Sequence, residues 1–291
     1  MSALKVFNKP YIVSLSGLSL EDNLEMLSAA MGAEGVDAVE LNLACPNIPG
    51  KPIIAYDFEE MDRVLAAVTA VPAFGSKPFG VKLAPYLDVP HFDRAAAVLA
   101  KYPLAFVTTM NTLGNALFVD ADNECASIRA KDGFGGLGGG YVKHTALANV
   151  RLLSQKLAAL GREDISVVGV GGVASGRDAF ELILCGAAAV QVGTCFWTEG
   201  PACFERIARE LEGIMAAKGY TSIDQFRGRL KPFVEPHKGR KESPKPEADE
   251  LTPSGASSSF VYFLSSLVSV LVAVIVYLLI PFSTKVHMHS H

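Results

Sequence analysis

A cysteine between two asparagines is the part of this sequence that points most directly to chemistry. Cys45 lies in the run ELNLACPNIPGKP, which begins at Glu40, leaves an apolar stretch and enters a loop rich in proline and glycine. Asn42 and Asn47 flank the thiol, so we expect Cys45 in a polar, partly accessible place. A thiol there can serve as a base or nucleophile, whereas most cysteines are buried small apolar residues. The residues alone leave both interpretations open.

Three more polar residues follow apolar stretches that resemble strands. Lys82 ends one such stretch, and Asn111 and Thr112 follow another. A lysine in this place could stabilise negative charge on a ligand, although a solvated or paired lysine is the ordinary alternative. Asn111 and Thr112 could donate to and accept from a planar ligand, or they could be ordinary turn formers.

Two glycine-rich segments predict a phosphate site, because glycine lets backbone N–H groups approach a phosphate closely. Gly171 and Gly172 follow one strand-like run, and Gly193 and Thr194 follow the next. The first segment also resembles a dinucleotide-binding fingerprint, but no acidic residue stands near position 190 to complete it. Residues 131–140, which include Gly139 and Gly140, could border the same ligand or form a flexible surface loop.

The elements that must position these residues alternate between short apolar runs and amphipathic segments. We expect strands at 11–15, 38–43, 79–83, 105–109, 166–170 and 189–192, and helices at 20–31, 58–68, 92–99, 146–160 and 177–184. Near-continuous apolar strands separated by helices suit a doubly wound sheet or a barrel. The polar residues gather at the C-terminal ends of the strands, which favours the α/β barrel of the (β/α)8 TIM type.

The composition excludes some classes of function. The chain has 291 residues, half of them hydrophobic, and a formal net charge of −4, so a basic nucleic-acid-binding face is not expected. The five cysteines show no C-x-x-C spacing and no regular framework, which argues against a zinc site or a disulfide scaffold. A single domain that binds a small ligand is the better expectation.

The C-terminal part changes character. We expect residues 1–233 to form the barrel domain and residues 234–259, rich in Glu, Lys, Pro and Ser, to be a disordered linker. Residues 260–280 carry no charge and are long enough for a transmembrane helix, with 281–291 as a short tail. These patterns predict a single-pass membrane localisation with the catalytic part in the cytosol.

The run from Glu40 through Phe58 closely resembles the catalytic loop of class 1A, fumarate-type dihydroorotate dehydrogenases. The runs KPFGVK with Pro85-Tyr86, MNTLGN from Met110 and KDGFGGLGGG from Lys131 extend this resemblance in the same order. The family implies a (β/α)8 barrel, an FMN cofactor and oxidation of (S)-dihydroorotate to orotate in pyrimidine (UMP) biosynthesis. It also implies fumarate as electron acceptor and a homodimer.

The resemblance assigns roles residue by residue. It implies that Cys45 is the catalytic base and that the substrate is bound by Asn42, Asn47, Asn111 and Thr112. It implies that FMN is held by Asn42, Lys82, Asn111, Gly139, Gly140, Gly171, Gly172, Gly193 and Thr194. Ala44 and Thr112 stand where the family usually has serine.

The resemblance runs from about residue 9 to residue 231, but the family's chain begins earlier. Six expected strands cannot close an eight-stranded barrel, and counterparts of the family's first two strands are missing. We expect a truncated form of an active enzyme. The alternatives are an inactive, membrane-tethered barrel remnant that acts as a binding or scaffold protein, and a related flavin barrel that oxidises dihydropyrimidine.

Overall fold

The computed structural model describes residues 9–45 and 52–233. The chain divides into two units, Met1–Pro232 and Phe233–His291, and the description below concerns the first. The expected linker, transmembrane helix and tail at 234–291 lie outside the described residues, as does Asn47. Within the described ranges no helix is both long and apolar enough to cross a membrane.

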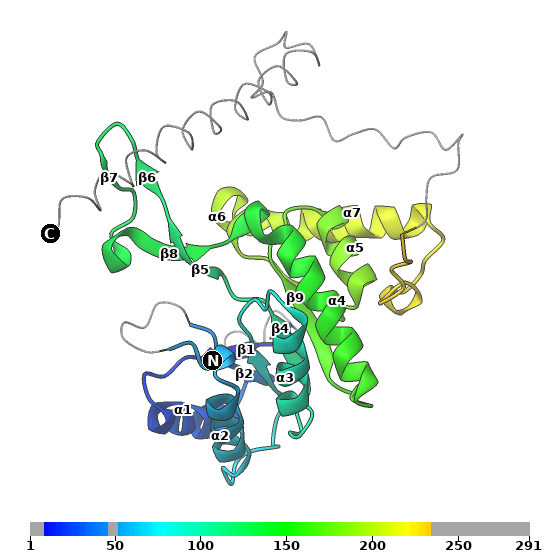
Figure 1. The fold of residues 1–291 in the computed structure, drawn as a ribbon. Coiled ribbons are helices and arrows are strands. Elements are labelled where there is room, and N and C mark those ends of the chain that lie inside the picture. The colour runs from blue at the N-terminus through cyan, green and yellow to red at the C-terminus, as the bar shows by residue number, and fades with distance from the viewer. Residues whose placement is uncertain (1–8, 46–51, 234–291) are drawn as a thin grey trace, which may run out of the picture. The chain divides into compact units, whose positions relative to one another are not determined.

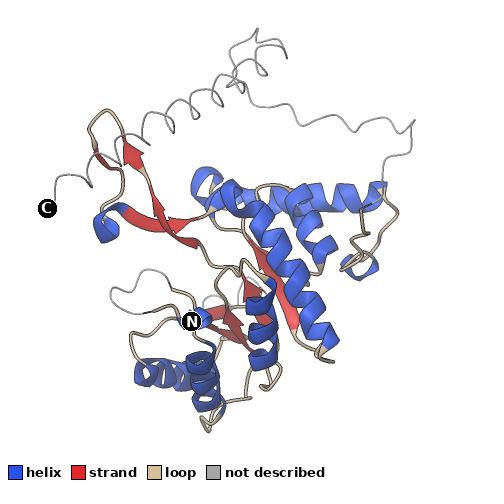
Figure 2. Ribbon diagram, viewed as in Figure 1, coloured by secondary structure: helices blue, strands red, loops and turns tan. Residues whose placement is uncertain are grey.

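Six parallel strands form the main sheet, and helices cover one of its faces (Figures 1 and 2). Their order is β1 (Ile12–Leu15), β2 (Ala38–Asn42), β3 (Phe79–Lys82), β4 (Phe106–Thr109), β9 (Ser166–Val170) and β10 (Ala189–Gln191). The helices that connect them are α1 (Leu20–Gly32), α2 (Phe58–Thr69), α3 (Val89–Leu99), α4 (Lys143–Ala159) and α5 (Gly176–Cys185). All six expected strands and all five expected helices are confirmed. More than half of their ends are shifted, by one to three residues.

The two faces of the sheet differ in cover. Leu41, Val81, Val107 and Val167 are partners in register across four strands, and each is buried under the helices. In-register residues of parallel strands point to the same face, so these residues define the outer, helix-covered face. On the other, inner face the strand ends are less protected, and Ser14, Ser166 and Ala189 are exposed. A closed barrel would bury this inner face, so the sheet is an open part of one.

Helix starts follow the capping rules that the sequence contains. Ser19 and Asp22 form a capping box at α1, with bonds of 3.0 and 2.9 Å between each side chain and the other residue's N–H. At α5 only half of such a box is made. The Ser175 hydroxyl accepts from the N–H of Asp178, but the Asp178 carboxylate accepts from Ala174 N–H instead of Ser175 N–H.

Three features of the described chain were not expected from the sequence. An arm of short antiparallel strands, β5 (Leu113–Leu117), β6 (Val119–Asp120), β7 (Cys125–Ala126) and β8 (Phe134–Leu137), projects from the main sheet (Figure 2). The short helix α6 (Thr194–Glu199) follows β10. Helix α7 (Ala202–Ala217) comes next and packs against α5 and α6.

Candidate active site

A cavity of about 350 Å³ opens at the C-terminal ends of β3, β4, β9 and β10. It brings together most of the residues that the sequence singled out: Lys82, Asn111, Thr112, Gly139, Gly140, Gly171, Gly172, Gly193 and Thr194. Parallel strands deliver their C-terminal ends to one rim, which is why residues more than a hundred positions apart meet here. Asn42 and Cys45 instead line a neighbouring cavity of about 400 Å³ beside α1 and α2.

Asn42 links the two cavities. Its Oδ1 accepts from the Nδ2 of Asn111 at 3.1 Å and from the backbone N–H of Ala44 at 3.0 Å. The Oδ1 of Asn111 accepts in turn from the backbone N–H of Thr112 at 2.8 Å. Two amide side chains from neighbouring strand ends are thereby held in fixed orientations. Cys45 follows on the same loop and is partly exposed.

Two tyrosines hydrogen-bond the segment that follows the Cys45 loop to the loop after β3. The hydroxyl of the buried Tyr86 donates to Ala55 O at 2.9 Å, and that of Tyr56 donates to Pro85 O at 2.8 Å. Burial raises the pKa of both phenols, so they stay protonated donors. Asn149 of α4 is buried and bonds both the N–H and the C=O of Tyr86, at 2.8 and 3.0 Å. The chain on the C-terminal side of the Cys45 loop is therefore held firmly.

A polar network below the cavity fixes Lys82, and its other members were not predicted from the sequence. Lys82 Nζ donates to Gln191 Oε1 at 3.3 Å, and Gln191 Nε2 donates to Glu40 Oε2 at 3.4 Å. Glu40 is only 3 % exposed and also accepts from the Thr108 hydroxyl at 2.5 Å. A carboxylate only accepts, so it turns the amide nitrogen of Gln191 toward itself and the amide oxygen toward Lys82. A charged residue inside the apolar run AVELN was the signal available in the sequence.

The glycine loops suit a phosphate. Gly171 and Gly172, however, are required by their backbone conformation and by packing, rather than by close approach to a phosphate as expected. Gly171 and Gly172 have φ of +135° and +72°, which other residues rarely adopt. A Cβ at Gly172 would meet the Lys143 Cβ at 2.6 Å, so glycine is needed there for packing against α4. At Gly193 an added Cβ would meet nothing within 4 Å. The open backbone at the cavity wall leaves space for a ligand of the size of a phosphate group.

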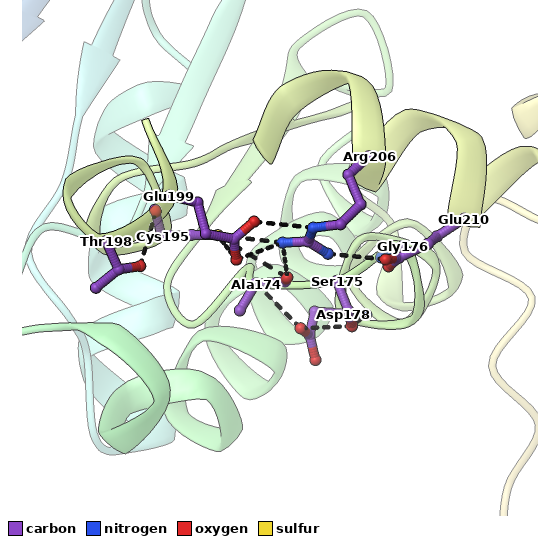
Figure 3. A network of polar contacts seen from close by, with 9 residues as sticks. All are labelled: Ala174, Ser175, Gly176, Asp178, Cys195, Thr198, Glu199, Arg206 and Glu210. Carbon is purple, nitrogen blue, oxygen red and sulfur yellow. Dashed lines mark hydrogen bonds and ion pairs between the residues drawn. The ribbon is translucent and has the colours of Figure 1, made fainter. Parts of the chain in front are cut away.

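Behind this wall the side chain of Arg206 joins α6, α7 and the loop after β9 (Figure 3). The buried thiol of Cys195 donates to Glu199 Oε1 at 3.3 Å in the same cluster. Burial, and then the neighbouring Glu199 carboxylate, raise the pKa of Cys195 to about 11. Cys195 is therefore a protonated structural thiol. On the outside of α6, Trp197 is 85 % exposed and its ring lies 6.3 Å from that of Phe196.

An open parallel sheet with helices on its outer face, and with polar side chains and glycine loops at one rim, defines part of an α/β-barrel enzyme. The family model described as dihydroorotate dehydrogenase matches residues 4–215. The chain belongs to the dihydroorotate dehydrogenase family.

Individual relatives agree with this assignment. The chain is 51 % identical over 219 residues to a probable dihydroorotate dehydrogenase A (fumarate) of Enterococcus faecalis, covering 75 % of this chain and 68 % of the relative. It is 51 % identical over 217 residues to the dihydroorotate dehydrogenase (fumarate) of Saccharomyces cerevisiae, covering 75 % and 67 %. The chain thus spans about two thirds of the length of these relatives.

A solved structure shares the fold. The DHODH of Eimeria tenella, crystallised with ferulenol, matches with a TM-score of 0.57 at 20 % identity. The match covers 73 % of this chain and 59 % of that one, which fits an open part of a barrel.

The expected membrane localisation is corrected by these findings. No helix in the described ranges could cross a membrane, and the relatives that match are named as fumarate-type enzymes. The matched residues end at 215, before the segment on which the expectation depended.

Proposed function

We propose that this chain oxidises (S)-dihydroorotate to orotate with FMN as cofactor and fumarate as electron acceptor. The observation that carries the proposal is the single cavity in which Lys82, Asn111 and Thr112 face two glycine loops. One end of this cavity offers open backbone for a phosphate, and the other offers a cation and amide groups. FMN has the same polarity, with a phosphate at one end and an electron-accepting ring at the other.

Each residue has a part that follows from its chemistry. Bound FMN would accept the hydride that leaves C6 of dihydroorotate. Cys45 would remove the proton from C5, as the resemblance implies, since it is a partly exposed thiol next to the substrate-binding amides. Lys82, held by Gln191, would stabilise the negative charge that accumulates on the reduced cofactor. Asn42 and Asn111 are oriented by each other, and with Thr112 they would bind the polar edges of the substrate. Asn47, as the resemblance implies, would also bind the substrate.

The proposal includes a homodimer. Its support is the arm, on which Leu117, Phe118 and Val119 are exposed together with Ile128 and Phe134. Apolar side chains gathered on one projecting element are typical of a protein interface. Sedimentation of the wild type and of Val119→Lys tests this. A wild type that sediments as a dimer and a variant that sediments as a monomer would show association through the arm.

The test of the activity starts from purified protein with FMN added in excess. Anaerobic addition of (S)-dihydroorotate should bleach the absorbance of bound flavin, and fumarate should restore it. Dihydrouracil serves as the control substrate, because a dihydropyrimidine-oxidising enzyme would be bleached by it instead. If the protein binds no FMN, or if dihydroorotate leaves bound flavin oxidised, the proposal is wrong.

A further inference from the structure

Arg206 contacts both of the segments that form the phosphate end of the cavity. Its guanidinium makes two bonds with Glu199 of α6, Nε to Oε2 at 2.9 Å and Nη2 to Oε1 at 2.6 Å. The same Nη2 donates to the carbonyl oxygen of Ala174 at 3.0 Å, in the loop that follows Gly171 and Gly172. Ala174 and Glu199 both line the cavity, so a single side chain joins two of its walls (Figure 3).

Glu210 extends this connection to the start of α5. Its Oε1 accepts from Arg206 Nη1 at 2.8 Å, and its Oε2 accepts from the backbone N–H of Gly176 at 2.7 Å. A Cβ at Gly176 would come within 2.3 Å of the backbone nitrogen of Leu211, so α5 and α7 touch through their backbones here. The loop 171–176 is therefore fastened at Ala174 and at Gly176.

The charges of the cluster indicate that its role is geometric. The bond from Arg206 lowers the pKa of Glu199, and the bond from Gly176 N–H, followed by that from Arg206, lowers the pKa of Glu210. Both carboxylates are therefore ionised at neutral pH. One guanidinium between two carboxylates leaves a net negative charge, which does not attract a phosphate. What Arg206 can supply is the spacing of the backbone groups around it.

We propose that Arg206 is a positioning residue for the cofactor phosphate. It holds the loop after β9 and the segment Gly193–Glu199 at the separation at which their backbone N–H groups converge on one phosphate. The planar guanidinium, with five donors in a fixed fork, is suited to this task, and a lysine ammonium cannot reproduce it. The inference rests on the proposed function, because it takes the phosphate to be that of FMN.

The test compares FMN with riboflavin, which lacks the phosphate. Apoprotein is titrated with each flavin by fluorescence, and the ratio of the two affinities reports on the phosphate site alone. Arg206→Lys keeps the charge and removes the fork, so FMN affinity should fall on the order of tenfold while riboflavin affinity stays almost unchanged. Arg177→Lys is the matched control, because Arg177 pairs with Glu181 on the same region of α5 but is 80 % exposed and lies away from the cavity.

Other outcomes overturn the inference. Equal loss of FMN and riboflavin affinity in Arg206→Lys would assign Arg206 a general structural role, and unchanged FMN affinity would exclude any role in binding. If Arg206→Lys does not fold, Glu210→Gln gives the same comparison, since it weakens the fork from the other side and Glu210 does not line the cavity. A wild type that binds FMN no better than riboflavin would instead refute the phosphate site itself, and with it part of the proposed function.

Discussion

The thiol of Cys45 is the residue on which the proposed reaction depends most. Cys45→Ala removes the proposed base but should leave the cavity that contains Lys82 and the glycine loops unchanged, because Cys45 lines the neighbouring cavity. The variant should bind FMN as the wild type does, and reduction by dihydroorotate should slow on the order of 10²-fold or more. Stopped-flow reduction measures this, with a dithionite reduction as control for intact flavin. Reduction at nearly the wild-type rate would show that another group takes the proton.

The other cysteines should differ in reactivity according to their surroundings. Cys195 is buried with a pKa raised to about 11, so it is almost fully protonated at pH 8, whereas Cys125 is exposed on β7. Iodoacetamide at pH 8 should label Cys125 much faster than Cys195 in the folded protein. Peptide mass spectrometry measures both sites in one sample, and a urea-unfolded sample gives the upper limit. Equal rates in the folded protein would contradict the burial of Cys195 beside Glu199.

At the residue scale the sequence indicated candidate residues that lie near each other in the chain or end a strand. Lys82, Asn111 and the glycines gather in one cavity because they follow parallel strands. Glu40, Gln191 and Arg206 were not predicted, because their importance comes from contacts across the fold. Gln191 bonds with Lys82, 109 positions away, and no local spacing encodes that contact.

Among the elements, the loop between β10 and α6 gives the sharpest test of the phosphate site. Gly193 has a negative φ of −114° and its Cβ position is open, so alanine fits without a clash in the protein itself. Gly193→Ala should leave thermal stability nearly unchanged and lower FMN affinity, because its methyl group stands at the wall of the cavity. Isothermal titration measures the change.

Gly213→Ala is the control for Gly193→Ala. Gly213 lies within α7 and also has open space around its Cβ position, but it does not line the cavity. This variant should keep its FMN affinity and gain roughly 0.5–1 kcal/mol of stability, because alanine is the better helix former. If both variants bind FMN as the wild type does, the phosphate lies elsewhere.

The elements were predicted where hydrophobic periodicity is strong and missed where it is weak. The six strands carry β-branched apolar runs, and α1 and α5 begin at serine caps, which fixed their positions closely. The arm was not predicted: residues 131–140 are rich in glycine and were expected to border a ligand or form a loop, and β6 and β7 have only two residues each. Pairing across the arm, rather than local propensity, makes these segments strands.

For the molecule as a whole, the open sheet determines how firmly the cofactor is held. Among the described residues, strands β1 and β10 each pair on one side only, and Ser14, Ser166 and Ala189 on the inner face are exposed. A ligand bound at this rim has protein on part of its surface, so its dissociation should be fast. We expect desalting to remove most of the FMN from this chain, and added FMN to restore binding. Flavin absorbance before and after a desalting column measures this.

A protein that leaves the column with its FMN still fully bound would contradict this expectation.

The number of strands also explains why the sequence predicted a parallel α/β sheet but could not show whether that sheet closes into a barrel. Six strands were predicted, and among the described residues six strands form one parallel sheet. Unpaired edges of this kind associate readily, so sedimentation should accompany each binding measurement.

The fluorescence of the exposed Trp197 can report on whether the neighbouring cavity is occupied. The chain contains one tryptophan, and α6 carries it on the helix that begins at Thr194 beside the cavity. Oxidised flavin absorbs where tryptophan emits, so energy transfer from Trp197 would dim its emission whenever the neighbouring site is filled. Every arrival and departure of the cofactor could then be followed in real time in the unlabelled protein.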